Sequence, residues 1–151
     1  MKGVYTVTMT GSVSSAITLI QLKAGATIPL EIIRATVAQN NSTTSAMQSV
    51  ILVRKSGAAT VTSFTPVKTD EQDGAAAAAG GTSATGIIAT AEGTDTDIML
   101  NDAFNVLNGW LYLPVPEERI RVAPAGFLGL KFPNAPSTPL SIRATITFRE
   151  L

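Results

Sequence analysis

Strict alternation of apolar and polar residues is the feature that most constrains how this chain can fold. The clearest case is residues 140–149, in which Ser, Arg and Thr fill one set of alternate positions and the other set holds Ile142, Ala144, Ile146 and Phe148. A strand sends alternate side chains to opposite faces, whereas a helix would scatter both sets around its circumference. The segment therefore predicts a strand with one buried face.

Similar runs recur at short spacing along the chain. Turn-forming Gly, Pro, Asn and Ser residues separate them, as in the connections at residues 40–44 and 133–139. Many short strands without long helices are typical of a sandwich or a barrel. The predicted strands are residues 4–9, 16–22, 28–39, 47–55, 59–64, 110–113, 119–122, 127–132 and 140–149.

The fold class that this pattern predicts is all-β. The 151 residues are the usual size of one domain, so we predict a single β-sandwich domain over residues 1–151. A jelly-roll-like antiparallel β-sandwich is preferred, because two Greek keys accommodate eight strands in this length. An immunoglobulin-like sandwich is the alternative, although it usually needs fewer residues and strands.

Residues 70–107 interrupt the alternation. The Ala- and Gly-rich residues 70–96 predict a long flexible loop or insertion, with a short strand possible at 86–90. Such a loop is either an arm that orders against a neighbouring subunit or a tolerated insertion. Residues 97–107 predict the one short helix, because their apolar residues recur at roughly helical spacing and Gly109 is placed to end it.

The residue inventory excludes most catalytic chemistry. The chain has no Cys and no His, which rules out disulfides, thiolate metal sites and nucleophilic triads that use His. Among the carboxylates, Glu117 and Glu118 would point to opposite faces of an extended segment, which disfavours a carboxylate-only glycosidase. The acids at 92–97 lack the EF-hand pattern and only weakly indicate Ca²⁺. We therefore expect no enzyme activity, no cofactor and no metal.

Charge is balanced overall but segregated along the chain. Residues 69–116 contain seven acids and no Lys or Arg, and the remainder holds the eleven basic residues. Either the two ends steer partners or copies into register, or an acidic loop simply covers a mildly basic body. The bases are scattered and not interleaved with aromatics, so no nucleic-acid surface is predicted. No apolar run approaches the roughly 20 residues of a membrane helix, and no signal peptide is visible, so we expect synthesis in a cytoplasm.

Residues 109–119 are the densest candidate for an interface. In a strand, Trp110 and Tyr112 share one face and Leu111 and Leu113 share the other. The prolines that follow prevent ladder pairing, which predicts that this segment is an edge strand or leaves the sheet. These aromatics are read either as exposed interface anchors or as core residues before a proline-stiffened turn.

The charged corner that follows completes the predicted interface. Its residues are Glu117, Glu118 and Arg119, and they join Trp110 and Tyr112 as the candidate interface residues. We expect Arg119 to pair with Glu117 or with a carboxylate of a neighbouring protein.

Several segments together resemble small β-rich structural proteins of tailed bacteriophages. They are Ala-Phe-Asn-Val at 103–106, Gly-Trp-Leu-Tyr-Leu-Pro at 109–114, Pro-Glu-Glu-Arg at 116–119, the Thr-rich stretch 60–69, the Ala/Gly loop and the closing Ile-Thr-Phe-Arg-Glu strand. The resemblance implies a head decoration (cement) protein on the capsid surface of the virion. Its implied partners are the major capsid protein and its own copies, as a homodimer or homotrimer.

A second function stays open at this point. Jelly rolls are also lectin scaffolds, so the alternative is a receptor- or carbohydrate-binding module of a phage tail or fibre. That function needs exposed aromatic rings beside Asp or Asn in a concave site.

Overall fold

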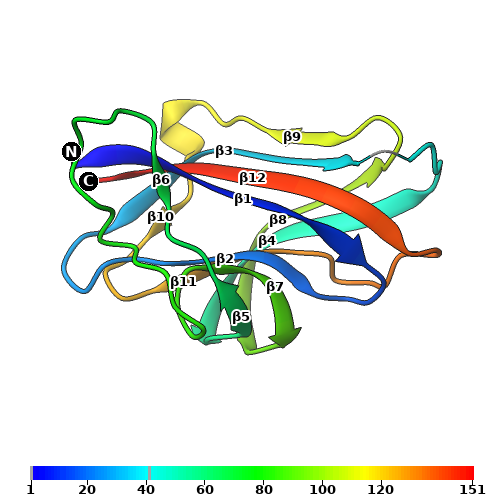
Figure 1. Cartoon of the computed structure of the whole chain (residues 1–151), viewed down its shortest axis with the longest axis horizontal. Coiled ribbons are helices and arrows are strands. Elements are labelled where there is room, and N and C mark those ends of the chain that lie inside the picture. Colours follow the sequence, from blue (N-terminus) through cyan, green and yellow to red (C-terminus); the bar gives the residue numbers. More distant parts are fainter. Residues whose placement is uncertain (1, 41) are drawn as a thin grey trace.

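The computed structural model describes residues 2–40 and 42–151 as two antiparallel sheets packed face to face (Figure 1). The first sheet contains β1 (Gly3–Val13), β3 (Leu30–Gln39), β6 (Val67–Lys68), β9 (Trp110–Tyr112), β10 (Arg121–Val122) and β12 (Leu140–Glu150). The second sheet contains β2 (Thr18–Lys23), β4 (Met47–Gly57), β5 (Thr60–Ser63), β7 (Gly86–Ala91), β8 (Thr94–Asn105) and β11 (Phe127–Lys131). A single 3₁₀ turn, η1 (Pro116–Glu118), precedes β10.

The strand order is that of a jelly roll. The first sheet runs β1-β12-β3-β9 and the second runs β2-β11-β4-β8, so early and late strands of the chain alternate in both. β1 and β12 pair over their whole length, from Gly3 opposite Glu150 to Val13 opposite Leu140. The short strands β6 and β10 and the β5–β7 pair extend this frame at its margins. The predicted all-β, jelly-roll-like sandwich is therefore confirmed.

The core lies between the two sheets and follows the alternation of the sequence. Along β12, Ile142, Ala144, Ile146 and Phe148 are buried, and the residues between them point outward. Phe148 packs on Tyr5 of β1 with ring centroids 5.7 Å apart. Each central strand of the first sheet thus contributes one side to the core and leaves the other as a surface.

The helix predicted over residues 97–107 is wrong, because this segment lies mostly within β8. β8 pairs with β4 along one edge of the second sheet, and the pairing shifts register at three places. These irregularities are β-bulges, which insert extra residues and break the period of two. Met99 and Leu100 are both half-buried as a result, and the apolar spacing imitates that of a helix.

The Ala/Gly segment is packed onto its own chain. The possible strand at 86–90 is present as β7, and Thr94 already begins β8. Ala78 is fully buried, and its N–H donates to Glu150 at 2.8 Å. A Cβ on Gly25 would lie 2.6 Å from the Cβ of Ala77, so the close approach of these two segments requires small residues. This part of the loop covers the sandwich instead of extending from it as a free arm.

Candidate interaction surface

The outer face of the first sheet, which points away from the second sheet, presents a regular grid of side chains. β12 lies between β1 and β3 (Figure 1). Thr145 of β12 is in register with Thr8 of β1 and with Thr36 of β3. One row nearer the chain termini, Thr147 is in register with Thr6 on one side and Arg34 on the other. The centre of the outer face is therefore a threonine-lined surface.

A buried carboxylate gathers three arginines at one end of this face. Glu31 of β3 is only 1% exposed, and register places Arg149 of β12 and Arg121 of β10 on its two sides. The Nε–H groups of both arginines donate to Glu31, from Arg121 at 3.2 Å. Arg119 approaches the same carboxylate at 3.6 Å. We call Arg119, Arg121 and Arg149 the arginine cluster.

The charge of Glu31 is maintained by this cluster. Burial would raise the pKa of Glu31, but the hydrogen bonds and positive charges of Arg149 and Arg121 outweigh it, so the pKa is lowered. Glu31 is thus ionised at neutral pH and neutralises one of three guanidinium groups. The arginine cluster retains a surplus of positive charge.

Three large apolar side chains project from the edge of the same sheet. Leu111, Leu113 and Val115 are 59%, 63% and 56% exposed. Leu111 is in register with Thr36, which places it on the outer face beside the threonines. We call these three residues the apolar ridge.

Trp110 belongs to the core, which decides between its two sequence interpretations. Its side chain is 8% exposed, and its Nε1–H donates to Asp102 of β8 at 3.0 Å. Its ring stacks on Tyr112, with centroids 6.3 Å apart and planes 10° apart. The interpretation of Trp110 as a core residue therefore holds, and Leu111, on the opposite side of the same strand, is exposed.

The charged corner also differs from expectation. Glu117 and Glu118 are exposed in η1, and the hydroxyl of Tyr112 donates to the backbone carbonyl of Glu118 at 3.3 Å. Burial, and then the charge of Glu118, raise the pKa of Tyr112. Arg119 pairs with Glu31 and not with Glu117. Glu31 was not among the predicted site residues, although a lone acid inside the apolar run 30–33 indicates a carboxylate that needs a partner.

Two of the acids considered for Ca²⁺, Glu92 and Asp95, are engaged by lysines. Lys55 is buried on β4, and its Nζ lies 2.6 Å from Asp95 and 3.4 Å from Glu92. Lys131 contacts the other oxygen of Asp95 at 2.7 Å. Burial would raise the pKa of Asp95, but the bonds from Lys131 and Lys55 outweigh it and lower the pKa. Within residues 2–40 and 42–151, no group of three metal-ligating side chains is found.

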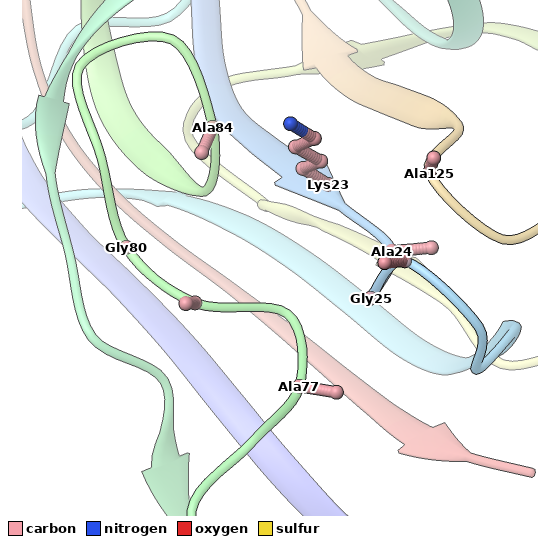
Figure 2. Close-up of a pocket in the computed structure, with 9 residues that line it drawn as sticks. Lys23, Ala24, Gly25, Ala77, Gly80, Ala84 and Ala125 are labelled. Carbon is pink, nitrogen blue, oxygen red and sulfur yellow. The ribbon is translucent and has the colours of Figure 1, made fainter.

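A pocket of about 250 Å³ lies between the end of β2 and the Ala/Gly segment (Figure 2). Ala77, Gly80 and Ala84 line it from the loop, and Lys23 and Gly25 line it from the other side. Lys23 is the only titratable side chain among the lining residues. The pocket therefore offers no acid–base pair for catalysis.

Fold and surface together define a jelly-roll β-sandwich with a Thr- and Arg-lined face bordered by an apolar ridge. Comparisons with protein-family models, with curated proteins and with solved structures found no match for this chain. Among the described residues, no helix is long and apolar enough to cross a lipid bilayer.

Proposed function

We propose that this chain is a structural virion protein that decorates and stabilises a tailed-phage capsid by binding the major capsid protein and its own copies. The phage setting rests on the resemblance of residues 103–106, 109–114 and 116–119 to tailed-phage structural proteins. The binding mode rests on the geometry of the first sheet.

The apolar ridge is the observation that carries the adhesive role. Three large apolar side chains, each more than half exposed, occur within five residues of one edge. Full burial of each against a partner is worth about 1.5–3 kcal/mol. Leu111 is held rigid because β9 pairs with β3 and Trp110 is anchored in the core, and Leu113 and Val115 follow β9 along the chain. A rigid ridge loses little conformational entropy on binding, and repeated attachment over a symmetric shell multiplies a modest single contact.

The receptor- or carbohydrate-binding alternative has weaker support. A sugar site needs exposed aromatic rings beside polar groups, and here Trp110 is buried and Tyr112 is half-buried against it. The exposed residues of this strand are aliphatic, which suits a protein surface better than a sugar ring.

Binding to shells assembled from the major capsid protein of the encoding virus tests the proposal. The double variant Leu111→Asp/Leu113→Asp is expected to keep its β-sheet circular dichroism and to lose at least about tenfold in shell affinity, measured by co-sedimentation. Ile98→Asp is the matched control, because Ile98 is 55% exposed on the second sheet, and it is expected to bind normally. A folded ridge variant that decorates shells as well as the unmodified protein would refute the proposal.

A further inference from the structure

The first sheet carries two charge clusters of opposite sign, one toward its β10 side and one at its β6 edge. The arginine cluster holds three guanidinium groups against the single carboxylate of Glu31. Across the same sheet, the turn after β6 carries Asp70, Glu71 and Asp73, and none of these forms an ion pair within the described residues. We call these three residues the acidic turn.

The arginines are oriented with hydrogen-bonding capacity to spare. Arg121 and Arg149 both bind Glu31 through Nε, and their terminal amino groups donate to no group in the described part of the chain. A guanidinium has five N–H donors, and its terminal pair matches a carboxylate. Arg121 is also 66% exposed, so its free donors face solvent.

Register fixes where the two clusters lie relative to each other. Val4 of β1, Arg149 of β12, Glu31 of β3 and Arg121 of β10 form one row across the first sheet. The acidic turn begins beside the start of this row, because the N–H of Thr69 donates to the carbonyl of Val4 at 3.0 Å. Adjacent strands lie about 4.8 Å apart, so along this row Thr69, at the start of the acidic turn, is roughly 10 Å from Arg149 and roughly 19 Å from Arg121.

A hollow accompanies the acidic turn. A pocket of about 260 Å³ is lined by Lys2, Val4, Thr69, Asp70 and Asp73. Val4 is in register with Arg149, and Gly3 completes the lining; a Cβ on Gly3 would lie 2.7 Å from Asp73 and 2.8 Å from the hydroxyl of Tyr5. Its two carboxylates suit the end of an arginine side chain, and the ammonium group of Lys2, which also lines the hollow, lies 3.6 Å from Glu150.

We propose that two copies of this chain form a two-fold dimer through their outer faces, in which the arginine cluster of each copy binds the acidic turn of the other. This inference deepens the proposed function, since it specifies how the protein would bind its own copies. A two-fold axis along the sheet, between β1 and β12, exchanges the two ends of every row. It brings Arg121 over the acidic turn, and the threonines of the central strands over each other.

The neighbouring row fits the same axis. It contains Val67 of β6, Thr6 of β1, Thr147 of β12 and Arg34 of β3. The two-fold operation places Arg34 of one copy over the exposed Val67 of the other, so like charges do not meet. Leu111 lies beyond β3 at the edge, and the apolar ridge remains free to bind the shell.

Charge reversal with rescue tests the dimer. Sedimentation equilibrium of the full chain at low salt is expected to give a dimer whose dissociation constant rises with ionic strength. Arg121→Glu and Asp70→Lys are each expected to weaken the dimer at least about tenfold, because each change affects both copies of the contact. An equimolar mixture of the two variants is expected to restore the dimer, since both contacts then join opposite charges. Asp97→Lys, on β8 of the second sheet, is the matched control and is expected to leave the dimer intact.

Several outcomes overturn the proposal. They are a monomer at all concentrations in low salt, a trimer or larger assembly, a dimer that neither reversal weakens, and a mixture that does not recover. Circular dichroism checks that each variant is folded, and Arg121→Gln provides a milder change at the same position. Shell binding through the apolar ridge is measured separately, so a monomer that still decorates shells would end this inference and leave the proposed function standing.

Discussion

Glu31 shows how one residue is controlled by side chains far away in sequence. It lies 90 residues from Arg121 and 118 residues from Arg149, and it is nevertheless enclosed by both. A carboxylate that is 1% exposed would be costly without such partners. The same contacts hold the arginines side by side on the surface, so Glu31 positions the arginine cluster without facing solvent itself.

The stability of the protein is expected to depend on the ionisation of Glu31. Its pKa in the folded protein is lowered below the ordinary value of 4.5, so the ionised carboxylate is more stable in the folded than in the unfolded chain. This contribution is complete above that value and is lost as the pH falls through the folded-state pKa. Glu31→Gln is expected to lower the free energy of unfolding by about 1–3 kcal/mol at neutral pH, as measured by urea denaturation.

The pH dependence separates this effect from simple damage to packing. The stability difference between the unmodified protein and Glu31→Gln should narrow as the solution is acidified below pH 4.5. Glu117→Gln removes an exposed carboxylate without an ion pair and serves as the control. A Glu31→Gln deficit of constant size from neutral to acidic pH would contradict the interpretation.

At the scale of elements, β9 is short and depends on one side chain. It has three residues, and among the described strands it pairs only with β3. Its position is therefore fixed largely by the burial of Trp110. The hydrogen bond from Trp110 to Asp102 also ties this edge of the first sheet to β8 of the second. Leu111 of the apolar ridge lies on this anchored strand, and Leu113 and Val115 follow it along the chain.

Removing that anchor is expected to destabilise the fold. Trp110→Ala should lower the free energy of unfolding by about 3–5 kcal/mol, because it leaves a large cavity in the core. Trp110 is the only tryptophan, so the variant has no tryptophan fluorescence with which to follow unfolding. Circular dichroism in urea therefore measures the change. Leu111→Ala on the same strand is exposed and should change stability by less than about 0.5 kcal/mol. A Trp110→Ala variant as stable as the unmodified protein would contradict the assignment of Trp110 to the core.

Elements with one clean buried face were predictable from sequence, and β8 was not. All nine predicted strands have a counterpart, because alternation survives where pairing is regular, as between β1 and β12. β8 is an edge strand with bulges, so its residues follow neither period, and the bulges depend on its partner β4. Part of the interaction surface was predictable, because residues 109–119 stand out in the sequence. The contact of Glu31 with Arg121 and Arg149 was not, because it depends on the register between separate strands.

At the scale of the whole molecule, the chain closes its core without a partner. Its accessible surface is 7,027 Å², close to the roughly 7,300 Å² typical of a compact monomer of 15.7 kDa. The central position of β12 makes this closure depend on the last strand, since β12 pairs with β1 on one side and β3 on the other.

Truncation is expected to show this dependence. Deleting residues 140–151 should abolish the folded state, because β1 and β3 lose their common neighbour and the core loses Phe148, Ile146 and Ile142. Gel filtration and circular dichroism are expected to report an expanded, unstructured chain. Deleting Leu151 alone, which is exposed, is the control and should leave the fold intact. A compact β-protein after the longer deletion would contradict this role of β12.

The pairing of β1 with β12 also bears on how fast the chain can fold. The two ends of the described chain lie side by side (Figure 1), and Gly3 is in register with Glu150. The most extensive pairing of the first sheet therefore has to wait for the ends of the chain to find each other, which is the slowest kind of contact to form. Joining those ends by a short linker and reopening the backbone in the proline-rich stretch 133–139 would turn this pair into a local hairpin. The permuted chain would then form this strand pair from residues that are close in sequence, and it is expected to fold faster.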